Sequence, residues 1–209
     1  MDELRSRFRT ALETLDHVQA EAVLQQALAE NSSLETIERL IAQVMEEFGA
    51  EWDAGRLALS QIYMSSRMCE QIVGRLFQSG ADHLKRTPRV AVAVLCDYHL
   101  LGKRIVYSVM RASGYDILDY GRLDVDTLAD RAVADRLDIL LVSVLMLPSA
   151  LKVRDLREAL EARRARVRIA VGGAPFLFDP ALWREVGADA MGRTAADAVR
   201  IVERWTEAA

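Results

Sequence analysis

The sequence predicts an α/β protein in which a small helical bundle precedes a doubly wound parallel sheet of five strands. Three observations lead to this prediction. Before residue 80, apolar residues recur at spacings of three and four without any proline, as expected for amphipathic helices. After Pro88, short apolar runs alternate with amphipathic stretches, which is the pattern of β-α units. Between the two parts, residues 80–88 combine glycine, proline and charged residues, as a linker does.

The helical domain is expected to span residues 1–79. Its first helix is predicted from one apolar stripe, which consists of Leu12, Leu15, Val18 and Ala22. A second helix, capped by Asn31–Ser33 and ended by Gly49, has a stripe of Leu34, Ile37, Ile41, Val44 and Met45. A third helix is expected from Ser60 to Phe77, with an apolar face of Ile62, Met64, Met68, Ile72 and Leu76.

The second domain is expected to span residues 89–209. Apolar runs predict buried parallel strands at 89–96, 138–143 and 167–171, with weaker strands at 115–119 and 188–191. Amphipathic stretches predict helices at 101–113, 124–135, 150–164, 179–186 and 194–206. Five consecutive β-α units indicate a flavodoxin-like sheet.

Composition excludes several classes of function. A net charge of −4 and a pI near 5.5 give no basic surface for nucleic acid. Cys69 and Cys96 lack C-x-x-C spacing and are expected to be structural thiols in a reducing compartment. The chain shows neither a signal peptide nor an apolar run of about 18 residues. We therefore expect a cytoplasmic protein that binds neither nucleic acid nor membrane.

Polar and small residues follow the predicted strands where parallel α/β sheets bind ligands, at the carboxyl ends. They are Asp97, His99, Gly102, Ser143, Ser149, Gly172, Gly173 and Gly192. In Asp97-x-His99-x-x-Gly102, a neutral imidazole can bind a metal while a carboxylate two residues earlier orients it. The paired glycines 172 and 173 suggest close approach of a ligand to the backbone. No glycine-rich phosphate loop follows any strand.

Other interpretations of single residues remain open. Asp97 could cap the helix that begins near residue 101, and His99 could be an ordinary loop histidine. A phospho-accepting receiver domain would need an acidic pair after the first strand and a further aspartate after a later one. This sequence has Cys96-Asp97-Tyr98 and Val142-Ser143-Val144 at those places. Trp52 could be a core residue as readily as an aromatic residue that covers a ligand.

Taken in order, these motifs resemble a known family. Asp97-x-His99-x-x-Gly102-Lys103, Ser143-x-Leu145, Val171–Pro175 and Gly187–Gly192 are similar to motifs of the cobalamin-binding domain of methionine synthase and of corrinoid proteins in methyltransferase systems. Upstream, Glu46–Gly55 and the following helix resemble the helical cap domain that precedes the corrinoid domain. The resemblance covers nearly the whole chain.

The resemblance implies a role for each residue at the lower face of the corrin. His99 would be the lower cobalt ligand, Asp97 would hold its other nitrogen and Ser149 would support Asp97. Ser143 would bond the benzimidazole of the displaced nucleotide tail, for which Gly102, Gly172 and Gly173 leave room. Lys103 would be solvated or would contact a phosphate or a corrin amide. Further contacts are expected from Tyr98, Leu145 and Gly192.

On the upper face, the resemblance implies that Trp52 is an aromatic lid. Our hypothesis is that Tyr63 lies over the cobalt as a steric or weakly coordinating group, with packing on its helix face as the alternative. Cobalamin photoreceptors of similar architecture carry Glu-His where this sequence has Ile62 and Tyr63. A light-sensing, histidine-ligated upper face is therefore not supported.

The implied function is that of a methyl carrier rather than a complete enzyme. Cobalamin, cycling between methylcobalamin and cob(I)alamin, would pass a methyl group from a donor-specific methyltransferase to a methyl-acceptor enzyme. A cobalamin-dependent sensor or storage protein is the alternative. An adenosylcobalamin mutase subunit would lack the helical cap, and a flavodoxin-type electron carrier is more distant.

Overall fold

A computed structural model describes residues 2–31, 34–76 and 88–207. The chain divides into two compact units, Met1–Ser79 and Gly80–Ala209, and each is described by itself. The segment expected to be a linker lies outside the described residues except for Pro88, as do Ser32 and Ser33 of the expected cap.

In its described residues, the N-terminal unit consists of α1 (Asp2–Glu13), α2 (His17–Asn31), α3 (Leu34–Asp53) and α4 (Leu59–Leu76). Their facing sides bury a core that includes Phe8, Leu12, Leu24, Ile41, Phe48 and Ile72. The predicted bundle is therefore present, and α4 follows its predicted span closely.

The single helix predicted from the first stripe is wrong. The chain turns between α1 and α2, where Leu15 has a φ of +55° and Asp16 accepts a hydrogen bond from the Gln19 amide as an N-cap. Val18, a predicted stripe residue, is 77% exposed. The predicted stripe ran across this turn, from the end of α1 into the start of α2. The residues that are buried are Leu4, Phe8, Ala11 and Leu12 on α1 and Ala20, Val23, Leu24 and Ala27 on α2.

Gly49 does not end its helix, because α3 continues to Asp53. The turn comes at Gly55, whose φ is +71° and whose amide donates to the Trp52 carbonyl. The neighbouring amide of Arg56 donates to the Glu51 carbonyl. A residue at positive φ, rather than a glycine inside the helix, thus sets the end of α3.

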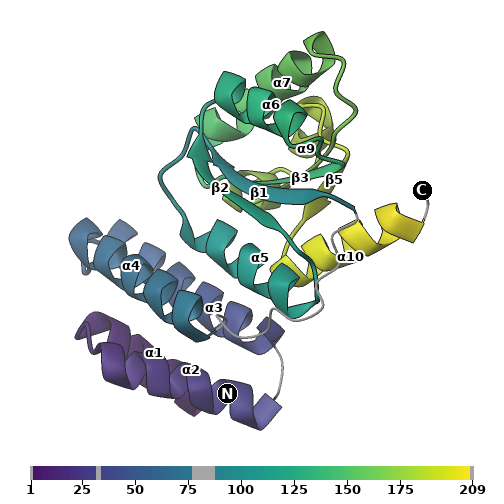
Figure 1. Ribbon diagram of the computed structural model, residues 1–209. Helices are drawn as coiled ribbons and strands as arrows, with labels where there is room; N and C mark the ends of the chain where they lie inside the picture. The colour runs from purple at the N-terminus through teal and green to yellow at the C-terminus, as the bar shows by residue number, and fades with distance from the viewer. Residues whose placement is uncertain (1, 32–33, 77–87, 208–209) are drawn as a thin grey trace. The chain divides into compact units, whose positions relative to one another are not determined.

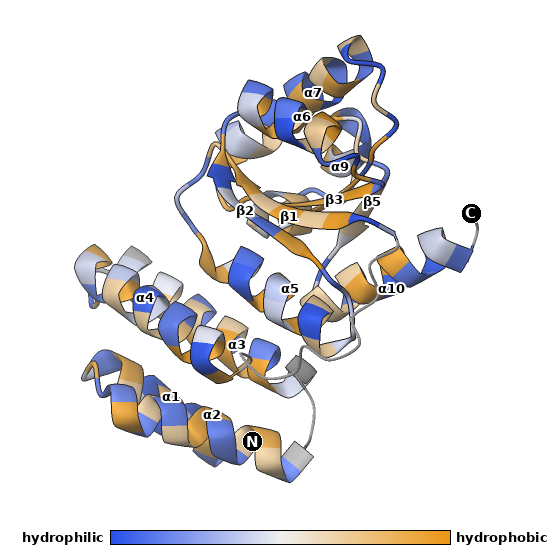
Figure 2. Ribbon diagram, viewed as in Figure 1, coloured by the Kyte–Doolittle hydropathy of each residue, from blue (hydrophilic) through white to orange (hydrophobic). Residues whose placement is uncertain are grey.

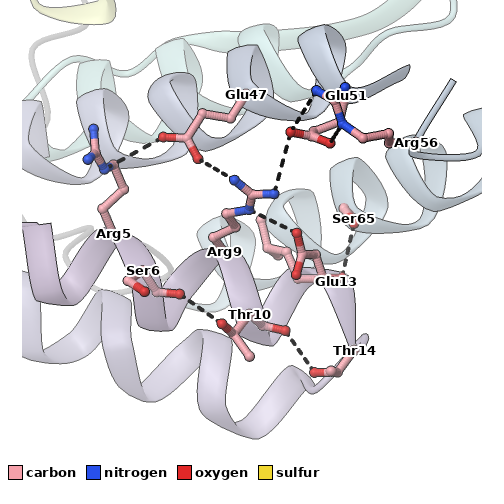
Figure 3. A network of polar contacts seen from close by, with 11 residues as sticks. Arg5, Ser6, Arg9, Thr10, Glu13, Thr14, Glu47, Glu51, Arg56 and Ser65 are labelled. Atoms are coloured by element: carbon pink, nitrogen blue, oxygen red, sulfur yellow. Dashed lines mark hydrogen bonds and ion pairs between the residues drawn. The ribbon is translucent and has the colours of Figure 1, made fainter. Parts of the chain in front are cut away.

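A network of ion pairs joins α1 to α3 (Figure 3). The Arg9 guanidinium bonds Glu13 at 2.8 Å and Glu47 at 3.4 Å, and Arg5 pairs with Glu47 at 3.6 Å. Glu51 completes the network with Arg56 at 2.6 Å. All these groups are partly exposed, so solvent screens the ion pairs and the apolar core carries most of the stability.

The C-terminal unit contains a parallel sheet with strand order β2-β1-β3-β4-β5, which confirms the predicted fold. Its strands are β1 (Val90–Leu95), β2 (Leu118–Leu123), β3 (Ile139–Ser143), β4 (Arg168–Gly172) and β5 (Ala190–Gly192). Only β2 departs clearly from its predicted span. Gly114 turns the chain at a φ of +87°, and Tyr115 and Ile117 are buried before the strand begins.

Helices cover both faces of this sheet (Figure 1). On one face lie α5 (Leu101–Ala112) and α10 (Ala195–Glu207), and on the other α6 (Val125–Ala134) and α7 (Leu147–Ala162). Strands β1 and β3 between them are apolar along most of their length (Figure 2). The helix predicted at 179–186 is present as the shorter α9 (Leu182–Glu185), and α8 (Ala174–Phe178), which was not predicted, precedes it. No helix among the described residues has the length and apolar character required to cross a bilayer.

Candidate functional site

The strand order places a topological switch point between β1 and β3. From β1 the chain moves outward to β2, and it then returns to β3 on the other side of β1. Open α/β sheets bind ligands at the carboxyl ends of the strands beside such a point. Here Asp97 and His99 follow β1, while Ser143 ends β3 and Leu145 lies just beyond it. The structure therefore brings together the two motifs that the sequence analysis singled out.

Asp97 is the centre of this site, with 2% of its surface exposed. Its Oδ1 accepts from the amides of Tyr98 at 2.6 Å and His99 at 3.2 Å, and lies 2.6 Å from His99 Nδ1. Its Oδ2 accepts from the amides of Leu145 at 2.7 Å and Met146 at 2.9 Å. One carboxylate thus joins the loop after β1 to the loop after β3.

The surroundings of Asp97 keep it ionised. Burial acts to raise the pKa of this carboxyl, but hydrogen bonds from the His99 ring and from the amides of Leu145, Met146 and His99 outweigh burial and lower the pKa to about 2. Because an ionised carboxylate only accepts, His99 Nδ1 must carry the proton that joins them. Nε2 is then the unprotonated nitrogen of the neutral ring, which is the form that binds metal.

The His99 ring is half exposed, with 51% of the side chain accessible. Its Nε2 has no hydrogen-bond partner among the described residues. Within those residues no group of three or more His, Cys, Asp or Glu side chains could hold a bare metal ion. The pairing with Asp97 allows His99 to supply one oriented nitrogen to a metal.

Ser149 does not support Asp97 in the way that the resemblance implied. Its hydroxyl donates to the Cys96 carbonyl at 2.9 Å, and in the described residues no hydrogen bond joins it to Asp97. Backbone amides already bond both carboxylate oxygens. Asp97 does not cap the next helix either, because α5 has Leu100 at its N-cap position and no capping side chain. Both expectations are corrected.

Small residues form a row across the ends of three strands. Ser143 is paired in register with Gly172, and Gly172 with Gly192. Gly102, on the first turn of α5, extends the row, because a Cβ there would lie 3.0 Å from Ser143 Oγ. The small residues thus let α5 and the ends of the three strands lie close to one another.

The structure explains why residue 173 is glycine, which the sequence alone did not. Gly173 has a φ of +120°, and a Cβ there would lie 1.7 Å from the Val144 carbonyl oxygen. A Cβ on Gly172 would lie 3.2 Å from the Gly192 carbonyl oxygen. The close approach at these glycines is therefore to neighbouring backbone, which corrects the inference that the pair itself indicates a ligand.

Exposed apolar side chains lie in the loops that Asp97 joins. Tyr98 is 75% exposed, and Leu145, Met146 and Leu147 are 44%, 51% and 54% exposed. Apolar surface held next to an oriented imidazole suits the face of a large flat ligand better than it suits water.

Lys103 is buried, contrary to the expectation that it is solvated or contacts a phosphate or a corrin amide. It is 4% exposed, and its ammonium lies 2.5 Å from both carboxylate oxygens of Asp119 on β2. Sequence reasoning also missed Arg122, whose guanidinium carbon lies 3.7 Å from the centroid of the Tyr98 ring. No sequence signal marks these pairs, because they depend on the register of β2 against β1.

Trp52 and Tyr63 belong to the N-terminal unit, at the end of α3 and on α4. Both are exposed, by 48% and 63% respectively. Their places above a corrin stay predictions.

Comparisons with known proteins place this chain in a family. The family described as B12 binding domain matches residues 89–203, and a second family of that description matches residues 4–77. The trimethylamine corrinoid protein of Methanosarcina barkeri is 27% identical over 97% of this chain and 96% of its own. Dimethylamine corrinoid protein 2 of Methanosarcina acetivorans is 30% identical over 79% of this chain and 78% of its own.

A solved structure, the monomethylamine corrinoid protein of Methanosarcina barkeri, shares the fold. Its TM-score is 0.80 at 24% identity, over 96% of this chain and 97% of its own. The first family match alone covers more than half of the sequence. This chain belongs to the B12 binding domain family and is homologous to the methylamine corrinoid proteins.

Proposed function

We propose that this protein binds cobalamin in the base-off, His-on form, with His99 as the lower cobalt ligand, and carries methyl groups between partner methyltransferases. The observation that carries the proposal is the Asp97–His99 pair at the switch point, which fixes one ring nitrogen and leaves Nε2 without a partner in the described residues. The names of the homologous corrinoid proteins support the choice of cofactor.

The described residues fit this cofactor. His99 would bind the metal, and the row formed by Gly102, Ser143, Gly172 and Gly192 would admit the nucleotide tail. Tyr98 and Leu145 would contact the corrin, while Ser149 would act only on the backbone before Asp97. When bound, cobalamin would supply a metal centre that can take up and release a methyl group.

The protein's own part in this chemistry is to control one proton. When Nε2 is not bound to metal, the His99 ring can take a proton there and become a cation. Asp97 Oδ1 lies 2.6 Å from Nδ1 of this ring. Because four backbone amides and the ring hold Asp97 as a carboxylate, we place the proton on His99 and not on Asp97.

The carrier role is tested by methylating the reduced, cobalamin-loaded protein with methyl iodide. We expect a light-sensitive methylated protein that gives up its methyl group only when an acceptor methyltransferase and its substrate are present. The donor side is tested with methylamines first, because the homologous proteins are named for them. We place the reaction in the cytoplasm.

Variants separate the carrier from the alternative. His99→Ala should lose the His-on spectrum, whereas His17→Ala, an exposed histidine of the other unit, should behave as wild type. A protein that binds cobalamin through His99 but exchanges no methyl group with any methyltransferase would be a sensor or storage protein, and the carrier proposal would be wrong.

A further inference from the structure

Edge strand β2 contains a bulge beside the His99 loop. Val92 pairs with Asp119 and Val94 with Arg122, so two steps along β1 match three steps along β2. Gly121, with a φ of +64°, supplies the conformation that this extra residue needs. Bulges of this kind redirect side chains and are frequent next to functional sites.

The bulge changes which side chains of β2 share a face. In a regular strand, positions 119 and 122 would point to opposite faces of the sheet. With the extra residue, Asp119 and Arg122 fall in line with Val92 and Val94, which are two residues apart. Tyr120 and Leu123 correspondingly pack in the core on the α6 and α7 side. The bulge therefore directs one acidic and one basic side chain to the α5 side.

These two side chains hold the chain on both sides of His99. Arg122 stacks on Tyr98, the residue before His99, with its guanidinium carbon 3.7 Å from the ring centroid. Asp119 binds the buried ammonium of Lys103, four residues after His99, and also accepts from the Gly121 amide at 2.8 Å. Asp97 holds the same loop on its β3 side.

Lys103 has no other evident reason to be buried. It lies in the first turn of α5, where the helix dipole disfavours a cation, and α5 has neither a capping side chain nor an acidic residue in that turn. Its pairing with Asp119 offsets the cost of burying the ammonium and the unfavourable interaction with the helix dipole. The same pairing fixes the start of α5.

We propose that Asp119, Arg122 and Lys103 are positioning residues for His99, aligned by the β2 bulge, and that they set the balance between His-on and His-off cobalamin. This inference rests on the proposed function. It adds that the edge strand, which carries none of the expected ligand-binding residues, determines how firmly the imidazole is presented.

Arg122→Ala is the main test, because Arg122 is exposed and its loss leaves no buried charge. Arg131→Ala is the matched control: Arg131 stacks on Tyr120 at 4.3 Å, which is the same kind of contact at the same bulge but on the opposite face. Lys103→Met tests the second anchor and leaves Asp119, whose side chain is 40% exposed, accessible to water.

Two measurements are made on the full chain. In the apoprotein, hydrogen exchange of the amides at Tyr98 and His99 should become about fivefold faster in Arg122→Ala and unchanged in Arg131→Ala. In the cobalamin-loaded protein, the ratio of His-on to His-off spectra should fall by about the same factor, with cobalamin still bound. Lys103→Met should shift both measurements in the same direction.

The outcomes separate the two proposals. If wild-type protein shows no His-on spectrum, the proposed function is wrong, while the exchange measurement still tests the anchoring. If wild type is His-on but Arg122→Ala and Lys103→Met match it in both measurements, the inference is overturned. An equal effect of Arg131→Ala would also overturn it, because the bulge would then act only through general stability.

Discussion

His99 can present one nitrogen because Asp97 holds the other, and Asp97 is held in turn by backbone amides of two loops. The contact between Asp97 and His99 could be predicted from the sequence, because the two residues are two positions apart at the end of a predicted strand. It could not predict the amides of Leu145 and Met146, which are 48 and 49 positions away from Asp97. A backbone donor has no residue type, so it leaves no mark in a sequence.

Asp97→Asn and Ser149→Ala distinguish the observed contacts from a relay of His99, Asp97 and Ser149, in which Ser149 would bond Asp97 as the resemblance implied. An amide at residue 97 stays neutral and presents one acceptor oxygen, so it holds His99 more weakly. We expect the affinity of His99 for cobalt to fall by about 10–100-fold. Ser149→Ala removes only the bond to the Cys96 carbonyl and should leave the His-on spectrum and its pH dependence unchanged. A shifted pH profile in Ser149→Ala would restore Ser149 to the relay.

Burial of Cys69 on α4 is expected to make the free energy of unfolding depend on pH through this one residue. Burial, and then the neighbouring Glu70, raise the pKa of this thiol from 9.0 to about 12. Between these values the unfolded chain has lost the proton and the folded chain retains it, so stability falls as pH rises. At pH 10.5 the loss should be about 2 kcal/mol. Urea unfolding of wild type and Cys69→Ala at pH 8 and 10.5 checks this, and equal pH slopes would contradict it.

At the scale of elements, the sheet was predictable because buried parallel strands are short continuous apolar runs. Helix ends were less predictable. The stripe from Leu12 to Ala22 crossed a turn, and Gly49 lay inside α3, since a periodic pattern does not record where capping and positive φ interrupt it. The β2 bulge was equally hidden, and with it the pairing of Lys103.

The conformation of the loop after β4 depends on Gly173. Gly173→Ala combines positive φ with a Cβ that would meet the Val144 carbonyl oxygen, so we expect a loss of at least about 2 kcal/mol. Gly114→Ala is the matched control: its φ is +87°, but nothing lies within 4 Å of the added Cβ, and about 1 kcal/mol is expected. Chemical unfolding measures both, and equal losses would show that the Val144 contact relaxes freely.

At the scale of the whole molecule, the family prediction is confirmed, because ordered motifs along nearly the whole sequence carried it. Asp97, His99 and Ser143, which we propose for the lower face, lie at one switch point of the C-terminal unit. The upper-face residues, Trp52 and Tyr63, are exposed on the N-terminal unit, and their role stays a prediction. The sequence could not predict how residues of the two units lie relative to each other. Hydrophobic periodicity predicts single helices and strands, whereas contacts between units depend on surfaces.

Coordination of the cobalt by His99 can be measured by electron paramagnetic resonance of the cobalt(II) form. Protein labelled with ¹⁵N-histidine is loaded with unlabelled cobalamin. We predict hyperfine splitting from a single axial ¹⁵N nucleus, and loss of that splitting in His99→Ala. Splitting from ¹⁴N in the labelled wild type would show that the benzimidazole of cobalamin remains on the metal, and would contradict coordination by His99.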